Sequence, residues 1–139
     1  MSMSDCIFCK ILDGELPSAK VYEDEDVYAF LDISQVSKGH TLVIPKNHTE
    51  NIYETDEETA QKVFARIPKI ANALQKTYEP KGMNILQNNG EFAGQTVFHL
   101  HIHLIPRYDN NEDGFDLKWV THNDAYDLQE LSNEIRKNI

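Results

Sequence analysis

The segment His99-Leu100-His101-Ile102-His103-Leu104 places a histidine at every second position. Successive side chains of a β-strand point to opposite faces, so this spacing predicts a strand over residues 97–105 with all three imidazoles on one face. The apolar residues between the histidines predict that the other face packs on a hydrophobic core. We expect Pro106 to end the strand.

Three neighbouring imidazoles indicate a site with chemistry. Histidine is the side chain whose ordinary pKa lets it change charge near pH 7, and neutral imidazole is a nucleophile. Two alternatives remain open from the pattern itself. The row could be a polar strand face in contact with solvent, or it could supply zinc ligands, because imidazole binds zinc readily.

The composition favours a single domain, residues 1–139, that is long enough to bury a core. With 13 basic and 23 acidic residues the chain has a formal charge of −10, which argues against binding to nucleic acid or to an anionic membrane surface. An anionic ligand must then be held by local groups. No apolar run approaches the ~20 residues of a membrane span, and the N-terminus lacks the pattern of a secretory signal, so we expect a cytoplasmic protein.

Other patterns predict the elements around the histidine segment. They favour a short helix over residues 8–12 and a long helix from about 57 to about 78, with Thr55 and Glu58 at the spacing of a capping box. Pro68 lies inside the long helix and should kink it or split it. Further strands are expected over residues 19–22, 27–32, 41–44 and 84–87.

Two segments have the character of surface features. The acidic run at residues 23–26 predicts a solvated turn, and its four adjacent carboxylates point in different directions, so we expect no metal there. The tail is helical in character over residues 127–137 but has few strongly apolar positions, which is typical of a surface cap.

Cys6 and Cys9 are the two cysteines of the chain. A redox pair would lie between a strand and a helix, and nothing strand-like precedes Cys6, whereas a disulfide is disfavoured in a reducing compartment. Two readings are left: small buried side chains, or half of a zinc site. Two thiolates commonly combine with two imidazoles, which His40, His48 or the triad could supply.

A loop bracketed by glycines precedes the histidines. Gly90 and Gly94 flank it, and glycine lets backbone amides approach a ligand closely. Gln95 and Thr96 add an amide and a hydroxyl beside the triad. Because backbone donors in such loops can hold phosphate oxygens, we expect a phosphate-binding loop rather than a plain hairpin connection.

The stretch GQTVFHLHIHLIPR at residues 94–107 resembles the signature of the histidine triad superfamily of nucleotide hydrolases and transferases. CIFCKILDGELPSAKVYEDEDVYAFLDI at residues 6–33 and GHTLVIPKNH at residues 39–48 resemble the same family's N-terminal half. The likeness covers a core of residues 6–107 and leaves a tail of residues 108–139. It implies an α+β fold: an antiparallel sheet of about five strands with one long and one short helix, paired as a two-fold homodimer.

The resemblance implies roles for the histidines. In this family the middle histidine attacks the α-phosphorus of a nucleotide and forms a nucleotidyl-histidine that water hydrolyses, which makes His101 the nucleophile. His103 would contact the phosphate and assist proton transfer. His40 would orient the triad by fixing a ring tautomer, or it would be a buried histidine whose hydrogen bonds are satisfied.

The resemblance also implies how a purine nucleotide is held. Asp32 would accept hydrogen bonds from the ribose hydroxyls. The groups that hold phosphate or leaving-group atoms would be Asn88, Gly94, Gln95, Thr96, His101 and His103. No organic cofactor is implied.

Several bacterial members of the family combine an N-terminal CxxC with two histidines to bind zinc. Carried over to this chain, the ligands would be Cys6, Cys9, His48 and His99. Four protein ligands leave no open position for water, so such a zinc would be structural. Many members lack the cysteines, and zinc is therefore not essential to the family's reaction.

His103 separates two branches of the family, because hexose-1-phosphate uridylyltransferases carry glutamine at its position. A hydrolase is therefore favoured. We favour a phosphoramidase that cleaves the P–N bond of adenosine 5′-phosphoramidates and releases AMP. A dinucleoside polyphosphate hydrolase, to which Pro106-Arg107 points, is the alternative. Two further hypotheses are a zinc-stabilised nucleotide sensor without turnover and a metal-dependent hydrolase whose triad binds zinc.

Overall fold

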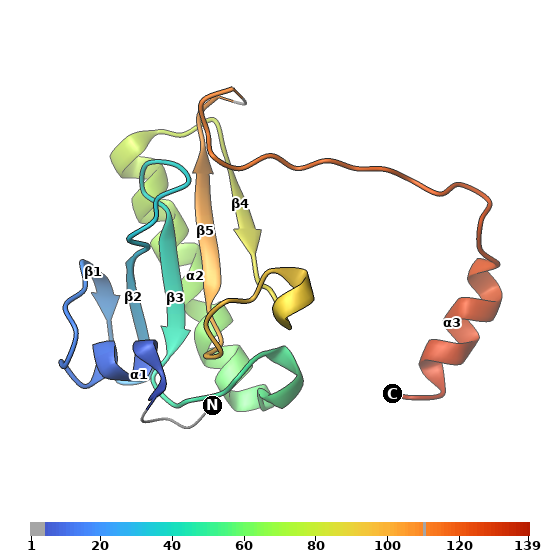
Figure 1. The fold of residues 1–139 in the computed structure, drawn as a ribbon, viewed down its shortest axis with the longest axis horizontal. Coiled ribbons are helices and arrows are strands. Elements are labelled where there is room, and N and C mark those ends of the chain that lie inside the picture. Colours follow the sequence, from blue (N-terminus) through green and yellow to red (C-terminus); the bar gives the residue numbers. More distant parts are fainter. Residues whose placement is uncertain (1–4, 110) are drawn as a thin grey trace.

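The computed structural model describes residues 5–109 and 111–139 and has the expected α+β architecture (Figure 1). Three α-helices, two 3-10 helices and five strands occur in the described residues. In chain order they are α1 (Ile7–Leu12), β1 (Lys20–Glu23), β2 (Val27–Leu31), β3 (Thr41–Pro45), η2 (Ile52–Glu54), α2 (Glu57–Tyr78), β4 (Gly82–Leu86), η3 (Glu91–Ala93), β5 (Ile102–Arg107) and α3 (Leu128–Arg136).

The five strands form one antiparallel sheet in the order β1-β2-β3-β5-β4. β5 enters between β3 and β4, so the strand that carries the last triad histidine has a neighbour on each side. His103 lies opposite Leu42 of β3 and opposite Leu86 of β4. β1 and β4 are the edges of the sheet.

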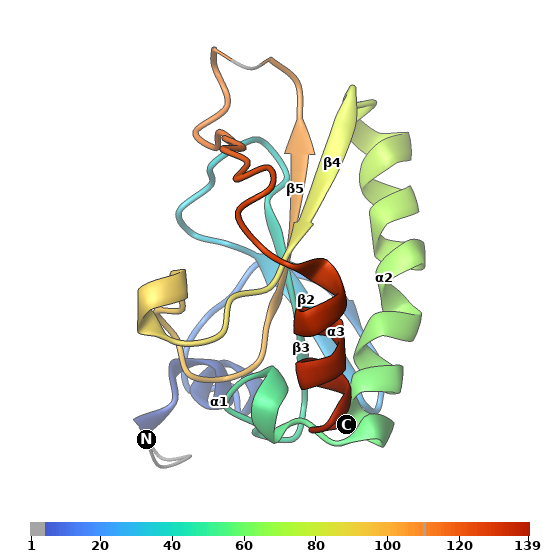
Figure 2. The same ribbon diagram turned by 90° about the vertical axis from the view of Figure 1, so that its right-hand side faces the viewer.

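The two faces of the sheet are covered by different helices, as Figure 2 shows with the sheet seen nearly edge-on. α2 packs on one face, where its apolar residues recur at helical spacing and meet Ile102 and Leu104 of β5. α1 lies on the other face, where Phe8 packs with Phe30 and Leu42. The face with α2 therefore packs a mainly apolar core, and the histidines lie on the face with α1.

The histidine segment is less regular than the alternation predicts. β5 begins at Ile102, so His99, Leu100 and His101 precede the strand rather than lie in it. The Leu100 amide donates to the carbonyl of Thr49 at 2.7 Å, a partner outside the sheet ladder. Regular pairing with β3 starts two residues later, at Ile102.

The expectation that Pro106 ends the strand is wrong, because β5 continues to Arg107. Pairing of β5 with β3 extends only as far as Leu104, whereas Pro106 still pairs with Met83 of β4. The Pro106 carbonyl accepts a hydrogen bond from the Ser37 hydroxyl at 2.5 Å instead of from a strand. The missing N–H of proline therefore costs no ladder hydrogen bond.

The long helix α2 is one continuous element and is not split at Pro68. Pro68 is exposed, so the carbonyl that it leaves without a partner one turn earlier is near solvent. Apolar residues on both sides of it, Val63, Ile67 and Ile70, hold the helix on the sheet. Its N-cap is Asp56, whose side chain accepts from the Thr59 amide, and the predicted capping box on Thr55 is displaced by one residue.

The acidic turn between β1 and β2 is fastened to α2 rather than simply solvated. Asp24 accepts from the amides of Asp26 and Val27, from the Tyr22 hydroxyl, and from Arg66 of α2 at 2.8 Å. Burial opposes ionisation of Asp24, but these hydrogen bonds outweigh it and hold its pKa well below the usual range.

Among the described residues, no helix has the length and apolarity needed to cross a bilayer.

The Asp24 cluster predicts a pH-dependent contribution to stability. Asp24→Asn should lower the free energy of unfolding by about 2 kcal/mol at pH 7, because it removes charge-assisted hydrogen bonds. Because the pKa of Asp24 is lower in the folded protein than in the unfolded chain, its carboxylate stabilises the fold at pH values above the unfolded pKa of about 3.9. This stabilisation is lost as the pH falls through the folded pKa. The difference in unfolding free energy between wild type and variant should therefore shrink at pH 3. Urea denaturation at both pH values measures it. Glu25→Gln, in the same turn but exposed, is the control, and an equal loss at pH 3 and pH 7 would contradict the assignment.

Candidate functional site

The triad histidines lie on the sheet face that carries α1, with His99 near the end of β3 and His103 near its start. His40 directly precedes β3 and His103 lies in the neighbouring strand β5. The rings of His101 and His103 are 4.9 Å apart, and those of His40 and His103 are 5.1 Å apart. His40, His101 and His103 therefore form one cluster, which we call the histidine site.

His101 is held in a single tautomer. Its Nδ1 lies 2.7 Å from the carbonyl of His99, and because a carbonyl can only accept, Nδ1 must carry the proton. Nε2 then carries a lone pair. The residue is 6% exposed, and the ring of Phe8 packs against the imidazole with the two centroids 5.2 Å apart and the two planes perpendicular. A fixed ring with a free lone pair has the properties of a nucleophile.

A chain of hydrogen bonds sets the tautomers of the other two rings. The Val36 amide donates to Nδ1 of His40, so Nε2 of His40 carries the proton. That Nε2 lies 2.9 Å from Nδ1 of His103 and donates to it. Nε2 of His103 is therefore protonated and is a donor. The cluster thus combines a lone pair on His101 with an N–H on His103.

Burial keeps these imidazoles neutral. It lowers the pKa of His103 to about 4, with further lowering from the neighbouring His101 and His40. Burial also lowers the pKa values of His40 and His101. For His101 the hydrogen bond to His99 and the charge of Asp32 oppose that effect. At pH 7 the site therefore contains neutral rings, the form in which imidazole is nucleophilic.

Asp32 lies at the edge of the histidine site. One of its carboxylate oxygens accepts from the Ser34 amide, and the other is 3.6 Å from Nε2 of His40. Sequence reasoning missed Gln35, whose side chain donates to the carbonyls of Asp32 and His40 and accepts from the amide of Gly39. Gln35 ties this loop together, and no local pattern in the sequence marks it.

The glycine-bracketed loop forms a compact turn around η3. Gly94 has φ of +99°, a backbone conformation that favours glycine, and its carbonyl is near the Asn88 side-chain amide at 3.4 Å. Thr96 is exposed. Gln95 is buried instead, and its side chain donates to the carbonyl of Glu50 at 2.8 Å and accepts from the amide of Gly90. Its amide group is therefore engaged in holding the loop.

Two cysteines and two histidines form a second cluster, which we call the Cys-His cluster: Cys6, Cys9, His48 and His99. Nδ1 of His99 is 3.4 Å from Sγ of Cys6 and 3.6 Å from Sγ of Cys9, and Nδ1 of His48 is 3.4 Å from Sγ of Cys9. Zinc with tetrahedral ligands at its usual bond lengths separates sulfur from nitrogen by about 3.5 Å. The donor set and its spacing fit zinc.

The surroundings of the Cys-His cluster also suit a closed metal site. Nε2 of His99 donates to the carbonyl of Pro45 at 2.9 Å, which leaves Nδ1 with the lone pair that faces the sulfurs. Cys6 and Cys9 are buried, and no disulfide joins them. Burial raises the pKa of Cys9 to about 12, so a cation is needed to hold this thiol as thiolate.

The fold and the histidine site define the class of protein. The HIT domain matches residues 13–110, and the chain belongs to the HIT family. The match omits Cys6 and Cys9 and ends at residue 110, before α3.

Three similar proteins place the chain within this family. It is 59% identical to a HIT family member from Bacillus subtilis, whose crystal structure superposes with a TM-score of 0.94 and covers 97% of each chain. It is 38% identical to the adenosine 5′-monophosphoramidase of Schizosaccharomyces pombe over 96% of this chain and 98% of that protein. A zinc-bound histidine triad protein from Mycobacterium smegmatis is 39% identical with a TM-score of 0.76, over 84% of this chain and 85% of that one.

The loop before the triad depends on Gln95. Gln95→Met keeps the volume but leaves the half-buried Glu50 carbonyl and Gly90 amide without these partners, so it should lower the free energy of unfolding by about 2 kcal/mol. Gln61→Met, at an exposed position on α2, should change it by less than about 0.5 kcal/mol. Chemical denaturation measures both, and hydrogen exchange at Gly90 reports the loop. Equal effects of the two substitutions would show that the Gln95 hydrogen bonds are dispensable.

Proposed function

We propose that this HIT protein is a nucleotide hydrolase that acts at the α-phosphorus of a purine nucleotide derivative and releases AMP, with His101 as the nucleophile. The observation that carries the proposal is the fixed tautomer of His101, whose Nδ1 donates to the His99 carbonyl and whose Nε2 is free to attack. The phosphoramidase among its relatives supports an adenosine 5′-phosphoramidate as substrate.

In the first step Nε2 of His101 attacks the α-phosphorus, and the P–N bond to the leaving group breaks. The leaving amine takes the proton of Nε2 of His103, and the negative charge left on that ring is balanced by the positive charge that the His101 ring gains with its bond to phosphorus. In the second step water attacks phosphorus, the bond to His101 breaks, and Nε2 of His103 accepts the proton of the water. AMP leaves and both rings return to their starting tautomers.

The other site residues predicted from the sequence have binding or positioning roles in this proposal. Asp32, beside His40, receives the ribose hydroxyls. Asn88, Gly94 and Thr96 bind phosphate or leaving-group atoms. Gln95 acts indirectly by holding the loop in place, because its side chain is hydrogen-bonded to the backbone amide of Gly90 and the backbone carbonyl of Glu50. The proposal therefore assigns Gln95 a positioning role rather than direct contact with phosphate.

A dinucleoside polyphosphate hydrolase is less well supported. Arg107, one of the two residues that suggested it, donates to Asp113 at 3.0 Å and to Asn84 at 2.7 Å. These two bonds fasten β5 to β4 and to the chain that follows it. The Arg107 side chain thus has a role in the fold that needs no second nucleotide.

We also propose that the Cys-His cluster binds one structural zinc ion. Cys6, Cys9, His48 and His99 would hold it, and the ion would join the N-terminal helix α1 to the segment before β5. No side chain of this cluster takes part in the reaction. The cluster contributes only by positioning, because the backbone carbonyl of His99 accepts the hydrogen bond that orients His101. The zinc-bound relative supports this proposal.

Removal of one predicted zinc ligand should lower the stability of the protein without a comparable loss of turnover. The wild type should contain about one zinc per chain and Cys6→Ala none, and Cys6→Ala should melt more than about 10 °C lower because metal binding contributes folding free energy. At 20 °C the loss of turnover in this variant should be small compared with its loss of stability. Metal analysis, thermal denaturation and the AMP assay test this. A wild type whose melting temperature is unchanged by complete chelation would contradict a structural zinc.

The nucleophile can be tested by AMP release from adenosine 5′-phosphoramidate at pH 7. His101→Ala should lower turnover about a thousandfold or more, because the covalent route is lost. His122→Ala, on an exposed residue of the tail, is the matched control and should leave turnover unchanged.

The same assay distinguishes the alternatives. Turnover that persists with excess chelator excludes a metal-dependent hydrolase. A wild type that binds AMP but releases none from any adenosine derivative would be a sensor. Release of AMP from a dinucleoside polyphosphate, but not from the phosphoramidate, would overturn the choice of substrate.

A further inference from the structure

The hydrogen bond between His40 and His103 has two possible arrangements. Nε2 of His40 and Nδ1 of His103 are 2.9 Å apart, and the proton between them can belong to either ring. The proposed reaction needs this proton on His40, because only then does His103 carry its own proton on Nε2, where it can be given to the leaving group. Proton transfer by His103 therefore depends on what selects the tautomer of His40.

The Val36 amide selects that tautomer. It can only donate, and it lies 3.4 Å from Nδ1 of His40, so the lone pair is kept on Nδ1 and the proton on Nε2. The Asp32 carboxylate is 3.6 Å from Nε2, which is too far for a hydrogen bond that would hold the proton there. The bond from Val36 is itself long, so a small displacement of Val36 would break it. The position of Val36 thus decides which ring carries the proton.

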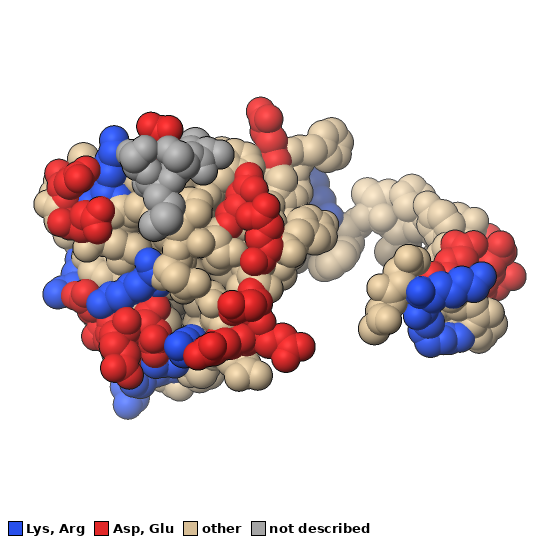
Figure 3. Space-filling model, turned by 90° about the horizontal axis from the view of Figure 1, so that it is seen from below, with Lys and Arg blue, Asp and Glu red and all other residues tan. Residues whose placement is uncertain are grey.

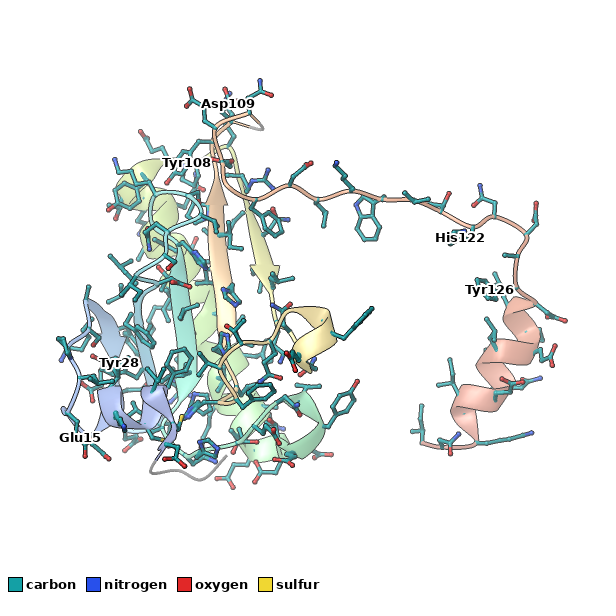
Figure 4. The ribbon with its side chains drawn as sticks, in the orientation of Figure 1. Glu15, Tyr28, Tyr108, Asp109, His122 and Tyr126 are labelled. Atoms are coloured by element: carbon teal, nitrogen blue, oxygen red, sulfur yellow. The ribbon has the colours of Figure 1, made fainter. Side chains whose placement is uncertain are left out.

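Val36 begins a short segment, residues 36–38, that is held by the chain at and beyond the end of β5. We call this segment the relay loop. In Figure 4 Tyr108 lies at the end of β5, beside the connection between β2 and β3 that contains the relay loop. Because His103 is also in β5, one strand supports both rings of the pair. Each residue of the relay loop is hydrogen-bonded to this part of the chain: the Gly114 amide donates to the Val36 carbonyl at 2.6 Å, the Ser37 hydroxyl to the Pro106 carbonyl at 2.5 Å, and the Tyr108 hydroxyl to the Lys38 carbonyl at 2.7 Å.

The contact between Gly114 and Val36 leaves no room for a side chain. A Cβ at Gly114 would lie 3.0 Å from the Val36 carbonyl oxygen and 3.4 Å from its Cα. Gly114 does not have a positive φ, so space rather than backbone conformation requires glycine here. The turn that presents Gly114 is fixed by the Asp113 carboxylate, which accepts from Nε of Arg107 and from the Tyr108 amide. Any side chain at position 114 would therefore push Val36 out of place.

The end of the tail lies apart from this contact. Figure 1 shows the chain running out beyond the edge strand β4 to α3, and Figure 3 shows the end of the chain separate from the body. The expectation that the tail is a surface cap on its own domain is therefore wrong. The part of the tail that bears on the histidine site is Gly114, through Val36.

We propose that Gly114 is a positioning residue for proton transfer in the histidine site. It holds Val36 in place, and Val36 fixes the tautomer of His40. That tautomer leaves a proton on Nε2 of His103. Gly114 acts on the reaction indirectly, through the hydrogen bonds from its own amide to Val36 and from the Val36 amide to His40. The inference rests on the proposed function, because it concerns the step that protonates the leaving group.

Nitrogen NMR of the isotope-labelled full chain at pH 7 tests the tautomer directly, because a protonated ring nitrogen and one with a lone pair have different chemical shifts. In the wild type His40 should carry its proton on Nε2. Gly114→Ala should place about half or more of His40 in the other tautomer, because Val36 is displaced and its hydrogen bond is lost. Gly82→Ala is the matched control, since a Cβ at Gly82 meets nothing within 4 Å. A wild type with the proton on Nδ1, or a Gly114→Ala spectrum identical to that of the wild type, would overturn the proposal.

The kinetic readout is a fall in kcat without a change in KM. For adenosine 5′-phosphoramidate, kcat of Gly114→Ala should fall at least about twofold, in proportion to the fraction of His40 that NMR shows to have lost the Nε2 proton. KM should stay close to the wild-type value, because the tautomer affects the chemical step rather than binding. Gly82→Ala should match the wild type. A rise in KM with kcat unchanged would show that the relay loop serves binding, and would refute the proposal.

A second pair of variants keeps the test valid if near-UV circular dichroism shows that Gly114→Ala does not fold. Tyr108→Phe removes only the hydrogen bond to the Lys38 carbonyl and should shift the His40 signals in the same direction, whereas Tyr126→Phe, at an exposed position, should not. Identical spectra for these two variants would contradict the proposal. A wild type that releases no AMP would refute the hydrolase instead, and the NMR comparison would still decide the role of Gly114.

Discussion

The hydrogen bond from Nδ1 of His101 to the His99 carbonyl connects the two parts of the molecule that carry chemistry. The ring of His99 belongs to the Cys-His cluster, and its backbone oxygen sets the tautomer of His101. The ring is itself fixed by the Pro45 carbonyl at the end of β3. A shift of His99 would therefore disturb both the Cys-His cluster and the orientation of the His101 lone pair. Both residues lie in the irregular segment that precedes β5.

The two faces of the sheet have different roles: one packs the core against α2, and the other carries the histidines. On the α2 side the contacts are mainly apolar and include Val43, Ile102 and Leu104, which are fully buried. On the α1 side the apolar contacts of Phe8, Phe30 and Leu42 surround the imidazoles and lower their pKa values. The first face supplies a rigid support. The second supplies a dry environment in which neutral histidine is the stable form.

The sequence predicted the features that depend on side-chain type and spacing. The histidine triad, the cysteine pair and the long helix were recognisable because alternation, CxxC and helical periodicity are local signals. The start of β5 was not, because it is set by a hydrogen bond between Leu100 and the distant Thr49. The burial of Gln95 and the continuation of β5 through Pro106 were missed for the same reason: their partners, Glu50 and Ser37, lie far away in the sequence.

The position of α3 after the whole sheet has a consequence for the order in which the molecule folds. Within the described residues all five strands end by Arg107, and α3 begins only at Leu128. During synthesis the sheet can therefore close around β5 before α3 emerges from the ribosome. The exposed apolar side chains of α3, among them Leu128 and Ile135, then reach solvent when the core of the sheet is already closed, which shortens the time for which they coexist with unfolded chain.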